Sequence, residues 1–123
     1  MTNTPAVLLY GFSAGEAVQL QNLLPGSPVR VISVPSSRHA MTLDDILSGK
    51  PTPAFLAAAS VPAKMLVLAN VQGALLSFLL SACKQVTGEQ HVLRALLTET
   101  NRTWTGIELC KHLLEEEEEL RKR

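Results

Sequence analysis

The stretch Leu93–Leu114, LRALLTETNRTWTGIELCKHLL, changes from an apolar run to an amphipathic helix through a short polar loop. The apolar run at its start is typical of a strand that is covered on both faces in an α/β sheet. Thr105 and Glu108 have the spacing of a capping box, in which the threonine hydroxyl accepts a hydrogen bond from a helix N–H and the glutamate reaches back to the cap backbone. The stretch therefore predicts a strand, a turn, and a helix that begins near Gly106.

The rest of the chain has the same alternation. An apolar run at residues 6–10 precedes a second capping box, Ser13 to Glu16, and the helix after it ends at Pro25 and Gly26. A strand at residues 29–34 precedes a cap at Thr42 and a helix that stops near Gly49. The second half then predicts strands at 65–69 and 92–97 and helices at 73–86 and from 106 onward.

We interpret this order as an internal duplication of a strand–helix–strand–helix unit, in which Leu9 aligns with Leu68 and Thr42 with Thr105. Strands that are joined by a helix pair in parallel, so each half contributes two parallel strands. The expected fold is α/β, with a four-stranded, largely parallel or mixed sheet packed with helices. We expect a single domain, 1–123, that consists of repeat one (6–49), a Pro-rich connector (50–63) and repeat two (64–123).

The composition excludes some classes of function. The charges of eleven basic and eleven acidic residues cancel, so the chain has no net charge that would attract nucleic acid or anionic lipid, and we expect neither as a partner.

The two cysteines lie in apolar helical patterns and predict buried, reduced thiols. The N-terminal sequence lacks the pattern of a secretory signal, which favours a cytoplasmic protein. Met65–Cys83 carries no charge and approaches the length of a membrane span, but its centre, Asn70–Gly73, is typical of a strand-to-helix turn.

The predicted helix at 73–86 has an apolar arc wider than one sheet face needs. One interpretation is a homodimer contact or a surface for another protein, because large exposed apolar patches mark interfaces. The other is a central helix covered by the connector, whose Phe55 and Leu56 argue against a free linker. The candidate interface residues are Leu75, Leu76, Phe78, Leu79 and Leu80.

The loop after residues 92–97 is the first candidate binding site. It lies at the carboxyl end of a strand and before a helix N-terminus, where open α/β sheets bind ligands and where anions are favoured. The alternative is that Asn101 and Thr105 cap backbone groups while Trp104 closes the end of the core. The candidate binding residues in this loop are Thr98, Thr100, Asn101, Arg102, Trp104 and Thr105.

Arg38 and His39 occupy the corresponding loop of the first half, beside the cap at Thr42. They would form a small anion pocket with Arg102 if the two loops face each other, and otherwise they are a solvated pair. Cys110 and His112 point to different faces of their helix, so we expect no metal site. The chain has no nucleophile motif and no glycine-rich phosphate loop, so catalytic residues stay unknown and no cofactor is expected.

The C-terminal tail, Glu115–Arg123, predicts a solvated helix end without function. Glutamates at 117, 118 and 119 each precede a basic residue by four positions, which is the favourable orientation for a helical ion pair.

The stretch from Leu93 to Leu114 is similar to a bacterial family called domain of unknown function 3783. Its pattern is a strand ending in L-x-A-L-L-T-x-T-N, then W-T and an amphipathic helix, and the strand opening V-L-L-Y-x-F is also similar to residues 7–12. The family carries N-G-F after its later strand, whereas this chain has Asn70, Val71 and Gln72. The resemblance implies a small cytosolic bacterial domain with no assigned activity.

Two functions fit these observations. The first is a non-catalytic module, homodimeric through the helix at 73–86, that binds a small ligand or a protein partner at the loop Thr98–Thr105. The second is an enzyme that acts on a small anionic substrate at the loops around Arg38/His39 and Asn101/Trp104.

Overall fold

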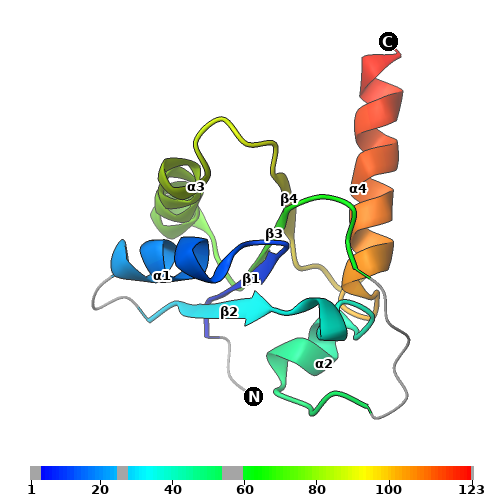
Figure 1. Ribbon diagram of the computed structural model, residues 1–123, viewed down its shortest axis with the longest axis horizontal. Coiled ribbons are helices and arrows are strands. Elements are labelled where there is room, and N and C mark those ends of the chain that lie inside the picture. Colours follow the sequence, from blue (N-terminus) through cyan, green and yellow to red (C-terminus); the bar gives the residue numbers. More distant parts are fainter. Residues whose placement is uncertain (1–3, 25–27, 54–59, 123) are drawn as a thin grey trace.

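The computed structural model describes residues 4–24, 28–53 and 60–122 (Figure 1). Its elements follow the alternation of strand and helix that the sequence predicts, with one extra turn of 3₁₀ helix, η1. The elements are β1 (Ala6–Tyr10), α1 (Ala14–Asn22), β2 (Arg30–Val34), η1 (Ser36–Arg38), α2 (Leu43–Leu47), β3 (Met65–Ala69), α3 (Gly73–Thr87), β4 (Leu93–Leu96) and α4 (Gly106–Arg121).

The four strands form one mixed sheet in the order β2-β1-β3-β4. β1 and β2 are parallel, β3 and β4 are parallel, and the central pair β1–β3 is antiparallel. The predicted α/β fold class, with a four-stranded mixed sheet packed with helices, is therefore confirmed. The two parallel pairs run in opposite directions. The carboxyl ends of β1 and β2 therefore lie at one end of the sheet, and the carboxyl ends of β3 and β4 lie at the other.

The central strands pair symmetrically about Leu8 and Val67, which lie opposite each other. Val7 faces Leu68 and Leu9 faces Leu66, so the two aligned positions Leu9 and Leu68 occupy equivalent places on either side of the centre. The halves share element order and parallel pairing, whereas the duplication of the sequence stays a prediction.

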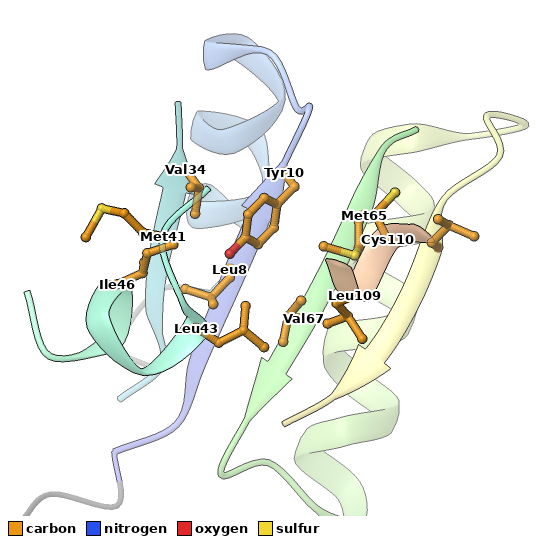
Figure 2. Close-up of a cluster of buried hydrophobic side chains, with 11 residues drawn as sticks. Leu8, Tyr10, Val34, Met41, Leu43, Ile46, Met65, Val67, Leu109 and Cys110 are labelled. Carbon is orange, nitrogen blue, oxygen red and sulfur yellow. The ribbon is translucent and has the colours of Figure 1, made fainter. Parts of the chain in front are cut away.

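Helices cover both faces of the sheet. α1 and α3 pack on one face, over a core that includes Val7, Leu9, Leu66 and Leu79. α2 and α4 cover the other face, where β1, β3, β4 and the two helices supply a second buried cluster (Figure 2). The strand residues alternate between these two clusters, as the two-residue period of a strand requires.

β4 corrects one expectation from the sequence. We expected a strand covered on both faces, but Arg94 is exposed and Leu96 is 47% exposed. The reason is position: β4 is at the edge of the sheet, pairs with β3, and turns only Leu93 and Ala95 toward the cluster under α4. β1 and β3, which lie inside the sheet, are the strands that are buried along their whole length.

The capping boxes at Ser13/Glu16 and Thr105/Glu108 are both formed, and Thr42 Oγ1 accepts a hydrogen bond from the Asp45 N–H. At the end of α4, however, the predicted pairs of Glu117 with Arg121 and of Glu118 with Lys122 are not formed, and the third, of Glu119 with Arg123, lies outside the described residues. Glu117 instead lies 2.9 Å from His91, and Glu118 lies 3.9 Å from Arg121. The last turns of α4 extend away from the sheet and the other helices (Figure 1).

The connector is described at residues 50–53 and 60–63, and Phe55 and Leu56 lie outside the described residues. Val61 packs against the cluster under α4. Met65–Cys83, the uncharged stretch, consists of β3, a turn and most of α3. In the described part of the chain, no helix combines the length and apolar character that crossing a membrane requires.

Candidate functional site

The two loops that the sequence singled out meet on the face of the sheet under α2 and α4. Thr42 and Thr105 form an isolated antiparallel bridge. The Asp44 N–H donates to the Arg102 carbonyl at 3.0 Å, and the Ile107 N–H donates to the His39 carbonyl at 3.3 Å. The loops therefore do lie side by side, but main-chain hydrogen bonds hold them together rather than leaving an open pocket between Arg38, His39 and Arg102.

Asn101 closes its own loop. Its Oδ1 accepts from the Thr98 N–H at 2.8 Å, and its Nδ2 donates to the Leu96 carbonyl at 3.0 Å. Its N–H donates in turn to Thr98 Oγ1 at 3.1 Å, and the residue is 8% exposed. These contacts agree with the interpretation of Asn101 as a cap, because its amide is used by the loop that follows β4.

His39 is a core residue, 3% exposed, which corrects its expected place at the surface. Its Nε2 lies 2.9 Å from the Val34 carbonyl, and its Nδ1 accepts from the Val61 N–H at 3.0 Å. Because Nδ1 is an acceptor, we assign the neutral tautomer with the proton on Nε2. Arg38 points elsewhere and donates from Nη2 to the Lys50 carbonyl at 2.6 Å.

The remaining predicted residues of the second loop have separate surroundings. Trp104 packs against the cluster under α4 and meets the His112 ring edge-on, with the ring centroids 5.2 Å apart. Thr105 Oγ1 accepts from the Glu108 N–H as the cap of α4. Thr100 is exposed on the loop. These positions fit a loop that is largely fixed by its own contacts.

Arg102 is held by two carboxylates. Its Nε lies 2.9 Å from Asp44 Oδ2, and its Nη1 lies 3.1 Å from Glu99 Oε1. The hydrogen bonds to Asp44 and then to Glu99 raise the pKa of Arg102, so the guanidinium stays cationic. A guanidinium that already faces two carboxylates attracts a further anion weakly, which argues against the anionic substrate of the second hypothesis.

A pocket of about 400 Å³ lies beside this arginine, and we call it the Asp44–Arg102 pocket. It opens at the carboxyl end of β3 and β4, between the loop after β4 and the end of α2. Two of the predicted binding residues, Thr98 and Arg102, line it. The full lining is Thr4, Arg30, Asp44, Leu47, Ser48, Asn70, Leu97, Thr98, Glu99 and Arg102.

Sequence reasoning missed six polar residues of this pocket, namely Thr4, Arg30, Asp44, Ser48, Asn70 and Glu99. Asn70 follows β3 and has φ of +59°, in the left-handed region that asparagine tolerates better than most residues. Asp44 comes from α2 and Arg30 from the first position of β2. Asn70 could have been found, because it follows a buried strand parallel to β4 and ligands gather at such carboxyl ends. Asp44 and Arg30 carry no comparable local signal.

The candidate interface on α3 is only partly exposed. Phe78 is 49% exposed, whereas Leu75, Leu76 and Leu80 are half-buried. Leu79 is 1% exposed and belongs to the core beneath the helix, so it cannot be a contact residue in this structure. The helix packs against α1 and the sheet, which accounts for most of its wide apolar arc.

A second charged cluster lies at the opposite end of the sheet and joins the two halves. Lys64 Nζ lies 2.7 Å from both carboxylate oxygens of Glu16, and it also lies 5.1 Å from the centroid of the Phe12 ring. Gln90 donates from Nε2 to Glu16 Oε2 at 3.1 Å. Burial alone would raise the pKa of Glu16, but the hydrogen bonds from Lys64, Ser13 and Gln90 outweigh it and lower the pKa to about 2. Both carboxylate oxygens are engaged, so this cluster is a clamp between α1 and the start of β3.

The fold and the pocket define a small mixed α/β protein with helices on both faces of its sheet and a polar pocket at the carboxyl end of one parallel pair. Residues 64–120, which run from the residue before β3 nearly to the end of α4, match the family described as Domain of unknown function (DUF3783). No curated protein and no solved structure matches the chain.

Proposed function

We propose that this protein is a non-catalytic binding module that holds a small polar ligand in the Asp44–Arg102 pocket. The observation that carries the proposal is the convergence of Arg30, Asp44, Asn70, Thr98 and Arg102 on one pocket from four separate segments of the chain. A pocket with a few convergent polar groups at the carboxyl end of parallel strands is the usual place for a ligand in α/β proteins.

The charges in the pocket indicate the kind of ligand. Arg30 and Arg102 bring two positive charges, and Asp44 and Glu99 bring two negative charges. A ligand with both a cationic and an anionic group, or with neutral hydrogen-bonding groups, matches this lining better than a simple anion does. Asn70 and Thr98 add neutral donors and acceptors, which fix orientation more than they contribute affinity.

An enzyme that acts on an anionic substrate is the second candidate, and less supports it. That hypothesis needs Arg38, His39 and Arg102 free to orient the substrate. Arg38 donates to Lys50, both ring nitrogens of His39 contact backbone groups, and Arg102 faces Asp44 and Glu99. The hypothesis would need these contacts to open when substrate binds.

The proposal includes a homodimer contact on α3, and it restricts this contact to the residues of the helix that are exposed or half-buried. Phe78, with half-buried Leu75, Leu76 and Leu80 beside it along the helix, would supply the contact. Sedimentation velocity of Phe78→Ser tests this point: a dimeric wild-type chain that becomes monomeric supports it, and a monomeric wild-type chain removes it.

The ligand proposal is tested by native mass spectrometry of the full chain against a panel of small zwitterionic, anionic and neutral polar compounds. We expect a zwitterionic or neutral compound to be retained. Arg30→Gln and Asn70→Gly should each weaken binding about fivefold. Glycine at position 70 keeps the left-handed backbone conformation, so this change removes only the side chain. Arg94→Gln is the matched control, because it removes an exposed arginine from the other edge strand outside the pocket. Binding that both pocket variants leave unchanged would contradict the proposal.

A further inference from the structure

We propose that the groove between β4 and the end of α4 binds an extended, basic segment of a partner protein, which adds to the sheet as a strand beside β4. This surface lies apart from the Asp44–Arg102 pocket, and the inference stands on three separate observations: a free strand edge, a groove beside it, and the charge of that groove.

The free edge is set by the direction of the backbone groups of β4. The Leu93 N–H donates to the Lys64 carbonyl at 2.9 Å, and the Leu97 N–H donates to the Leu68 carbonyl at 2.8 Å, both toward β3. Backbone groups of alternate residues point to opposite sides of a strand, so the N–H groups of Arg94 and Leu96 point away from the sheet. Among the described strands, β4 has β3 as its only neighbour. Such an edge is a template for strand addition.

The length of the edge is limited by Asn101, whose Nδ2 already binds the Leu96 carbonyl. An added strand would therefore use three backbone groups, the Leu96 N–H and both groups of Arg94. This is a short contact, so side chains must supply the rest of the affinity and all of the specificity.

A groove of about 400 Å³ lies beside the start of this edge, at residues 91–94. Leu93 from β4, Val92 just before it, and Leu113 and Leu120 from α4 give it an apolar floor, and Leu120 is 67% exposed. The last turns of α4 extend past the sheet (Figure 1), and residues 113–120 of this helix supply one wall of the groove. Alternate side chains of an added strand would point into it.

The charge of the groove selects a basic occupant. Two glutamates, Glu116 and Glu117, line it against one arginine, Arg94, and one histidine, His91, and the glutamates belong to a run of five at residues 115–119. Carboxylates near a helix C-terminus oppose the helix dipole and repel one another. Among the described residues, the ion-pair partners of Glu116 and Glu117 are histidines, His112 at 2.7 Å and His91 at 2.9 Å. Lysine or arginine side chains of an occupant would relieve this repulsion.

A protein segment fits these features better than the other candidates do. Nucleic acid and anionic lipid carry the same sign of charge as the glutamates. A second copy of this chain, paired edge to edge, would bring a single basic side chain from its own β4, Arg94.

The test uses a labelled synthetic peptide of about eight residues that alternates lysine and valine, and a control peptide with glutamate for lysine. Fluorescence anisotropy with the full chain should show binding of the lysine peptide alone. Glu116→Gln should weaken it about threefold, whereas Glu115→Gln, the same change one residue away and outside this groove, should not. Leu96→Pro removes an outward N–H and should weaken binding about tenfold.

Amide hydrogen exchange of the wild-type chain gives a readout that does not depend on whether Leu96→Pro folds. The lysine peptide should slow exchange of the Arg94 and Leu96 amides. Equal binding of both peptides, equal binding by the Glu115 and Glu116 variants, or unchanged exchange of these amides would overturn the proposal. Slow exchange of both amides in a dimer without peptide would also overturn it and assign the edge to a second copy.

Discussion

Thr42 and Thr105, the N-cap residues of α2 and α4, form a backbone bridge with each other. Each hydroxyl accepts from the N–H three residues ahead, so one pair of residues both starts two helices and joins the two halves of the chain. This junction joins the loops after β2 and β4. It therefore holds Asp44 and Arg102 beside each other in the Asp44–Arg102 pocket.

We expect Thr105→Ala to lower the free energy of unfolding by about 1 kcal/mol, because the Glu108 N–H loses its acceptor. Thr105→Ser keeps the hydroxyl and should retain most of the stability. Urea unfolding followed by Trp104 fluorescence measures both. Equal stability of the alanine and serine variants would show that the hydroxyl contributes nothing.

Gly106→Ala should destabilise the protein by about 1–3 kcal/mol through overpacking. A Cβ at this position would overlap the Tyr10 ring, lying 2.7 Å from Cζ and closer still to Cε2. Alanine is the better helix former by about 1 kcal/mol, so a net loss reports the collision with the ring. Tyr10→Leu in the same chain should reduce the cost of Gly106→Ala, and an unchanged cost in a double-mutant cycle would contradict the contact.

Tyr10→Phe should be neutral or stabilising by up to about 1 kcal/mol, which is unusual for a residue with no exposed surface. The Tyr10 hydroxyl is enclosed and has no hydrogen-bond partner among the described residues, and its burial also raises the pKa of the phenol. Removing an unsatisfied buried hydroxyl removes a desolvation cost. Thermal unfolding measures the change, and a large loss would mean that the hydroxyl has a partner in solution.

The Glu16–Lys64 clamp should make stability depend on acid pH. The pKa of Glu16 falls from 4.5 to about 2 in the folded protein, so the unfolded chain binds more protons between these values. The stabilisation from Glu16 is present above pH 4.5 and is lost as the pH falls toward 2. Wild type should exceed Glu16→Gln in stability at pH 7, and the difference should shrink through this window. A difference that stays constant with pH would show that ionisation of Glu16 plays no part.

Periodicity and caps were sufficient to predict the order of strands and α-helices, because β1 and β3 are continuous apolar runs and three of the four α-helices follow the N-caps Ser13, Thr42 and Thr105. The covering of β4 was not predictable in this way. An apolar run reports that a strand can be buried, whereas burial on both faces depends on strand order, which put β4 at the edge.

The site was predictable only where it is local. The loop after β4 was found because it follows a strand and precedes a cap, and Thr98 and Arg102 do line the pocket. Asn101 and His39 have the same polar character in the sequence but turn inward to backbone groups. Arg30 and Asp44 reach the pocket through the strand order and the Thr42–Thr105 junction, which no local spacing encodes.

The most direct test of the central claim is an NMR fragment screen of the full, ¹⁵N-labelled chain. For compounds that bind, we expect chemical-shift changes centred on the amides of Ser48, Asn70 and Thr98. We expect these changes to be lost in the Arg30→Gln variant. Binding compounds whose shifts centre elsewhere, or persist unchanged in Arg30→Gln, would contradict the claim that the Asp44–Arg102 pocket is the binding site of this protein.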